Sequence, residues 1–193
     1  MHWRNGVAND GAIPVPVYMV SQRPMPSLAY RHAIDALSAA NPKDGIAAIA
    51  AAEAALRAGL PRGEVISRVR KGLTAEPASA RGWLVLAEAL TPTNKRMAAE
   101  ALSQSLMLAP HEFWLAGPQS VDAAALWPDL DGDTQQAALR NARQLWDYPP
   151  LREHFFAVAD TPGAASVLNR AFSADEIRYI NRWGLLHEMG RAP

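Results

Sequence analysis

The stretch SARGWLVLAEALTPTNKRMAAEALSQSLMLAP, which runs from Ser79 to Pro110, has the clearest structural pattern in the chain. Its apolar residues recur at intervals of three and four on both sides of a Thr-Pro-Thr-Asn segment at 91–94. Side chains with this spacing lie on one face of an α-helix. The stretch therefore predicts two helices, over 79–90 and 95–108, that are joined by a tight turn and closed by Pro110.

The ending of this stretch recurs along the chain. Three segments begin with a small or branched apolar residue and end with a proline that follows a leucine by four positions: Val65–Pro77, Ala98–Pro110 and Ala137–Pro149. Their closing prolines lie 33 (110 − 77) and 39 (149 − 110) residues apart. A period near 34 residues is typical of helix–turn–helix repeats.

The central unit carries the clearest repeat pattern. Its first helix has Trp83, Leu86, Ala87 and Leu90, and its second helix has Ala98, Leu102, Ser105 and the closing Pro110. This pattern resembles the tetratricopeptide repeat, W-x2-L-G-x2-Y followed by spaced A, F, A and P, with Ala for Gly and Leu for Tyr. The chain is thus similar to a degenerate tetratricopeptide-repeat protein of bacterial type. The resemblance implies an all-α, TPR-like antiparallel helix-pair array, a short α-solenoid, over residues 27–150.

The two ends of the chain differ from this array. Residues 1–26 are rich in Pro and Gly, which excludes a long helix, and they predict an extended arm. The arm also carries apolar residues, including Trp3 and Tyr18, so we expect it to pack on the helical body, on a partner or on a second copy. Residues 151–193 predict an irregular helical C-terminal cap.

Further helices are expected from periodicity and from helix-start and helix-stop residues. They span 28–40, 45–58, 63–74, 121–127, 135–147, 151–159, 162–172 and 174–189. Expected N-caps are Ser27, Asp44, Ser173 and either Asp133 or Thr134. The segment 111–118 is expected to be aromatic and irregular, and Trp83 is expected to be buried between the helices of its own pair and the preceding one.

Composition excludes several classes of protein. The 193 residues include 19 basic and 19 acidic side chains, and this zero net charge argues against a general nucleic-acid binder. The chain has no cysteine, which excludes disulfides, thiolate catalysis and Cys-based zinc sites. No stretch approaches the roughly 20 apolar residues of a membrane helix, so direct membrane insertion is not expected. The chain as written predicts a cytoplasmic protein, or a periplasmic one if a signal or anchor precedes it.

No catalytic or metal-binding motif is evident. The segment Asp129–Asp133 resembles the start of a calcium loop, but such a loop needs Gly at its sixth position and Glu at its twelfth. Thr134 and Arg140 stand there, so a turn with a helix cap is expected instead. The five histidines are scattered without metal-ligand spacing. The sequence therefore predicts a protein that is not an enzyme and needs no cofactor.

An aromatic group in the C-terminal half supplies the candidate binding residues, which are Phe113, Trp114, Trp127, Trp146 and Tyr148. Three interpretations stay open: a core that closes the array, a groove for a partner protein, or a platform that stacks on sugars. The favoured function is a non-catalytic scaffold or assembly-accessory protein that binds another protein through a helical-repeat groove, with bacterial envelope or polysaccharide assembly as one setting. A homo-oligomer is compatible with it. The alternative is an enzyme or a small-ligand or sugar-binding protein with a site in the aromatic C-terminal half, which a closed polar pocket containing His111 or His154 would favour.

Overall fold

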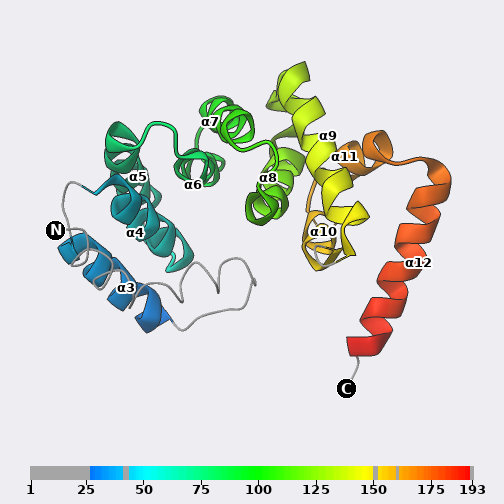
Figure 1. Cartoon of the computed structure of the whole chain (residues 1–193), viewed down its shortest axis with the longest axis horizontal. Coiled ribbons are helices and arrows are strands. Elements are labelled where there is room, and N and C mark those ends of the chain that lie inside the picture. The colour runs from blue at the N-terminus through cyan, green and yellow to red at the C-terminus, as the bar shows by residue number, and fades with distance from the viewer. Residues whose placement is uncertain (1–26, 41–43, 150–151, 160, 192–193) are drawn as a thin grey trace. The chain divides into compact units, whose positions relative to one another are not determined.

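The computed structural model describes residues 27–40, 44–149, 152–159 and 161–191, and every regular element within these ranges is a helix (Figure 1). The all-α prediction is therefore confirmed for the described part of the chain. The predicted arm over 1–26 lies outside the described residues. Contacts divide the chain after Leu108 into two compact units, each with its own packing.

The first unit is a succession of helices that each pack against the next one along the chain. They are α3 (Ser27–Ala40), α4 (Gly45–Arg57), α5 (Arg62–Ala75), α6 (Ala80–Leu90) and α7 (Lys95–Leu108). Every boundary agrees with the sequence-based expectation to within a residue or so, which is the usual uncertainty of a helix end.

Local capping explains this agreement. Asp44 accepts a hydrogen bond from the Ala47 N–H at 3.0 Å, and Ser79 accepts one from the Gly82 N–H at 3.1 Å. Each bond satisfies a backbone donor that the first helical turn leaves without a partner. Gly59, which follows α4, has a φ of +72°, the left-handed conformation in which glycine ends helices.

The helices α4 and α5 approach each other closely at two glycines. A Cβ atom on Gly72 would lie 2.6 Å from Cγ1 of Ile49 and 3.0 Å from the carbonyl oxygen of Gly45. A Cβ on Gly45 would in turn lie 2.8 Å from the Gly72 carbonyl oxygen. Only the absence of side chains lets the two backbones come this near, so the pair depends on glycine at both positions.

In the first unit α4 also packs against α6, which is not its neighbour along the chain, whereas α5 and α7 make no comparable contact. Ion pairs join α4 and α6: Arg81 pairs with the buried Glu53, and Nη2 of Arg57 donates to Oε2 of Glu88 at 2.9 Å. Burial raises the pKa of Glu53 above its ordinary value, although Arg81 acts in the opposite direction.

Trp83 is only half-buried, so its predicted burial holds in part. Its indole N–H donates to the carbonyl oxygen of Pro77 at 2.8 Å, which keeps the ring at the rim of α6 beside the preceding loop. Amphipathic aromatic side chains commonly take such positions because the N–H needs a partner. Removal of Trp83 should therefore cost less than the 3–5 kcal/mol typical of a fully buried aromatic site.

The second unit is built around a central pair of helices. Its elements are α8 (Phe113–Leu126), the short 3-10 helix η1 (Trp127–Asp129), α9 (Gly132–Asp147), α10 (Arg152–Ala159), α11 (Ala164–Ala171) and α12 (Ala174–Arg191). The central pair is α8 and α9, which pack against each other and each contact α10 and α11. The boundary that the sequence predicts at residue 150 lies inside this unit.

The helix α8 corrects the expectation of an irregular segment at 111–118 and a short helix at 121–127. It runs through Pro118, which cannot donate to the carbonyl of Trp114 four residues earlier. A proline normally also clashes with the Cβ atom and backbone of the residue before it. Here that residue is Gly117, which has no Cβ, so the clash with the proline ring is smaller and the helix can continue.

The start of α9 corrects a second expectation. Its N-cap is Asp131, whose Oδ1 accepts from the Thr134 N–H at 2.7 Å, in place of the expected Asp133 or Thr134. Asp133 instead lies in the first turn, where a negative charge is favourable. At α12 the expected cap is confirmed as a reciprocal box, because the Ser173 N–H donates to Glu176 at 2.8 Å and the Glu176 N–H donates to Ser173 at 3.3 Å.

Candidate functional site

The five candidate aromatic residues all lie in the second unit, but the structure separates them into two groups. Phe113, Trp114 and Tyr148 are 44%, 59% and 48% exposed, whereas Trp127 and Trp146 are each only 6% exposed. The first three residues are therefore accessible to a partner, and the last two belong to the interior. We call Phe113, Trp114 and Tyr148 the aromatic patch.

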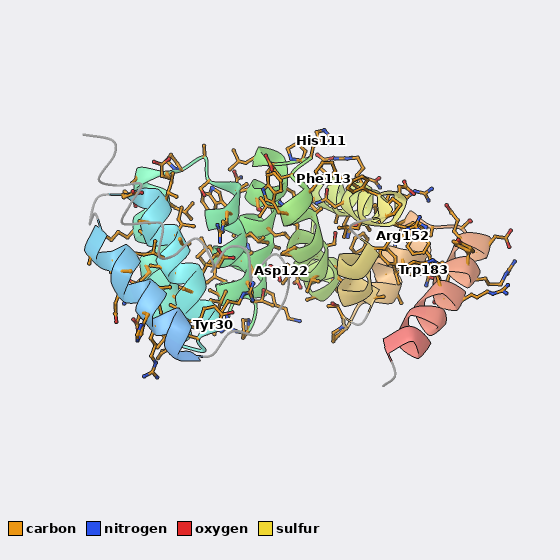
Figure 2. The ribbon with its side chains drawn as sticks, turned by 60° about the horizontal axis from the view of Figure 1, so that its bottom comes forward. Tyr30, His111, Phe113, Asp122, Arg152 and Trp183 are labelled. Atoms are coloured by element: carbon orange, nitrogen blue, oxygen red, sulfur yellow. The ribbon has the colours of Figure 1, made fainter. Side chains whose placement is uncertain are left out.

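The aromatic patch is formed where α8 begins and α9 ends. Phe113 and Trp114 are the first two residues of α8, and Tyr148 immediately follows α9. The rings of Phe113 and Tyr148 stack with their centroids 5.4 Å apart and their planes inclined by 23°. Figure 2 shows Phe113 beside His111 at this end of α8. The stack fixes both rings and ties the two helix ends together.

Trp146 organises the interior next to the patch. Its ring contacts Phe155, Tyr179 and Trp183, with centroid separations of 5.3, 6.0 and 6.2 Å. Arg152 places its guanidinium over Trp146 at 4.8 Å and over Trp183 at 5.6 Å, and Figure 2 labels Arg152 next to Trp183. Cation–π contacts of this kind contribute about 0.5–2 kcal/mol. This cluster joins α9, α10 and α12, so the role of Trp146 is to pack these helices together.

Sequence reasoning missed the arginines that hold these rings. Arg170 lies 5.4 Å from the centroid of Trp127, and Arg143 lies 5.0 Å from that of Phe172. Arg143 also donates to the Ala171 carbonyl and to Glu176, both at 2.9 Å. No short-range spacing links these partners, because 28 or more residues separate Arg143 from each acceptor. One usable signal was the i, i+4 spacing of Tyr179 and Trp183, which places both rings on one face of α12.

Polar side chains are buried between α8 and α9. The Asn141 amide donates to Oε1 of Gln119 at 2.8 Å, and both residues are almost fully buried. The hydroxyl of Ser120, also buried, has no hydrogen-bond partner within the described part of the chain. Because these polar groups do not reach the surface, they help to fix the packing of α8 against α9 and are not part of the aromatic patch.

The shifted carboxyl groups of the second unit are explained by helix caps. Hydrogen bonds from the Ser173 backbone N–H and from Arg143 lower the pKa of Glu176 to about 2. A hydrogen bond from the Thr134 N–H lowers the pKa of Asp131. Both shifts favour the charged carboxylate, as expected for an acceptor at a helix start, and neither marks a group prepared for proton transfer.

Histidine and carboxylate side chains are the groups that the pocket of the alternative interpretation would use. Within the described ranges, no three His, Asp or Glu side chains converge as a metal site, and no helix is long and apolar enough to cross a membrane. His111 is exposed on the segment before α8, and the side chain of His154 lies outside the described part. The Asp129–Asp133 segment forms the end of η1 and the cap of α9.

Comparison of the chain with protein-family models, with characterised proteins and with solved structures found no match.

Proposed function

We propose that this chain is a non-catalytic protein-binding module, a TPR-like array of helix pairs, which docks a partner protein through the aromatic patch. The observation that carries the proposal is the exposure of three large aromatic side chains at one edge of one compact unit. Soluble proteins seldom expose clustered apolar side chains unless a partner covers them.

Residue type and rigidity support a binding role for the patch. Trp and Tyr are enriched among the interface residues that contribute most to affinity. Each has only two side-chain torsions, so little conformational entropy is lost when a partner immobilises it. Phe113 and Tyr148 already hold each other in a stack, which lowers that cost further. Burial of their exposed apolar area would contribute about 25 cal/mol per Å2.

The packing of the first unit supports the repeat part of the proposal. Consecutive helices pair through short turns, and α4 and α6 contact each other across the intervening helix. Stacked helix pairs of a solenoid make this kind of neighbour contact and present extended surfaces to partners. Scaffolding in bacterial envelope or polysaccharide assembly remains the proposed setting, and the genes that neighbour this one are the simplest observation to test it.

Affinity capture from the native cell, followed by mass spectrometry, tests the proposed function. The variant is Trp114→Ala, because Trp114 is the most exposed ring of the patch, and the matched control is Met107→Ala, an exposed apolar residue of the first unit. A partner protein should be retained by the wild type and by the control but lost by Trp114→Ala. Equal retention by all three proteins would contradict the proposal. Quenching of Trp114 fluorescence by an oligosaccharide, with no protein partner, would instead favour the sugar-binding alternative.

A further inference from the structure

Two exposed acidic residues flank the aromatic patch. Glu112 immediately precedes Phe113, and Asp147 immediately precedes Tyr148. Because the rings of Phe113 and Tyr148 stack at 5.4 Å, the two acidic residues are brought to the same edge of the second unit. One comes from the start of α8 and the other from the end of α9, so their juxtaposition is produced by the fold and is invisible in the sequence.

The neighbouring cations leave this edge acidic. Within the described ranges Glu112 makes no ion pair, and Asp147 has only a long contact, 3.9 Å from its Oδ2 to Nε of Arg143. That guanidinium already donates to Glu176 at 2.9 Å, so one positive charge is divided between two carboxylates. Arg152 is engaged with the Trp146 ring and with the Trp146 carbonyl at 2.9 Å. The C-terminal end of α9 adds a partial negative charge, and the N-terminal end of α8, where Glu112 is the cap residue, adds a partial positive charge that offsets it, so the two carboxylates set the sign of this edge.

From this arrangement we propose that the patch binds a segment of a partner protein in which an apolar or aromatic residue is flanked by lysine or arginine. The inference rests on the proposed function and specifies the partner's chemistry. The apolar residue packs on Trp114 and Tyr148, and the basic residues face Glu112 and Asp147. The exposed aromatic faces favour the same partner, because they also attract cations.

Charge complementarity at the rim of a binding patch has two effects on binding. It speeds association and selects partners of the right sign, and it weakens as salt screens the charges. The aromatic contacts, in contrast, depend little on salt. A partner of this chemistry should therefore lose affinity as ionic strength rises, while an apolar partner without basic residues should not.

Selection from a random peptide library displayed on phage tests the inference. The purified chain is the bait, and a synthetic copy of the best peptide is titrated by fluorescence polarisation against the wild type and each variant. We expect lysine or arginine beside the apolar residue in the selected peptides. Trp114→Ala should weaken binding about thirtyfold, the loss of an interface hot spot. Glu112→Lys and Asp147→Lys should each weaken it about two- to fivefold, as solvent-exposed charges do.

Controls separate this inference from the proposed function. Glu100→Lys, which reverses an exposed acid of α7 that pairs only with Arg96 in the described interactions, should leave the affinity unchanged. The double variant Glu112→Lys/Asp147→Lys should select peptides with acidic flanks. If the selected peptides depend on Trp114 but lack basic residues, or if the double variant binds them equally well, the charge inference is wrong and the proposed function stands. If no peptide depends on Trp114, or if the patch only joins two copies of this chain in light scattering, both are overturned.

Discussion

Replacement of Gly72 by alanine measures how tightly α4 and α5 pack. The new Cβ atom would lie 2.6 Å from Cγ1 of Ile49, 3.0 Å from the Gly45 carbonyl oxygen and 3.1 Å from the Ile49 backbone nitrogen. Two of these three contacts are with backbone, which cannot rotate away. Ile49 is itself buried, so its side chain has little room to move.

The expected loss of stability in Gly72→Ala follows from two opposing effects. Alanine in the interior of a helix is favoured over glycine by about 1 kcal/mol. Overpacking of a tight core costs about 1–3 kcal/mol, and backbone contacts below ordinary separation place this site near the upper end. The net destabilisation should be about 2 kcal/mol, or roughly 4–8 °C in melting temperature for a chain of this size.

The same helix supplies the control. Gly63, in the first turn of α5, has no atom within 4 Å of its would-be Cβ, so Gly63→Ala should leave stability unchanged or raise it by up to about 1 kcal/mol. Urea denaturation monitored by far-UV circular dichroism measures both changes. In an Ile49→Ala background the cost of Gly72→Ala should shrink, because the nearest clashing atom is gone. A Gly72→Ala protein as stable as the Gly63→Ala one would refute the close approach of α4 and α5.

Three further predictions concern the second unit. Gly163→Ala should lower the free energy of unfolding by more than about 3 kcal/mol, because Gly163 has a φ of +91° and the new Cβ would meet a backbone oxygen of α8. The control in the first unit is Gly59→Ala, which has a φ of +72° but open space around the new Cβ. This change should cost only about 1–2 kcal/mol in the same urea titration. Glu176 has a pKa of about 2 in the folded chain, so the stability that its charge contributes is present above pH 4.5 and is lost as the pH falls toward 2. Glu176→Gln should remove this contribution to the loss of stability in acid, which unfolding at a series of pH values measures. Asp131→Ala should cost about 1 kcal/mol as a lost helix cap, and added calcium should not raise the wild-type melting temperature.

The sequence predicted the helices of the first unit well because their ends are decided locally. Asp44 and Ser79 each cap a helix through a residue three positions away, and Gly59 ends one through its own backbone conformation. Such signals need no knowledge of tertiary contacts. The helix α8 differs from the expectation because a proline usually stops a helix, whereas the preceding Gly117 has no Cβ atom and lets the helix continue.

The candidate site was predictable by residue type but not by exposure. Trp114 and Trp127 both lie at an end of α8, yet one is 59% exposed and the other 6%. Arg170 of α11 lies over the ring of Trp127, a contact between residues far apart in the sequence that local spacing cannot reveal. The stacking of Phe113 on Tyr148, and with it the pairing of Glu112 and Asp147 at one edge, likewise depends on how α8 packs against α9.

The position of the patch at helix ends allows binding and folding to be tested separately. Within α8 the chain changes from the exposed Trp114 to the buried Leu115 and Ala116 in a single step, so the packed layer begins just after the patch. Truncation of Trp114 removes a ring that the core does not use. Truncation of Trp146, buried among three aromatic rings beneath Arg152, would instead empty the core and reduce binding through unfolding alone. Loss of binding at Trp114 with stability unchanged is therefore the result that identifies a recognition surface, and the same loss at Trp146 identifies nothing beyond packing.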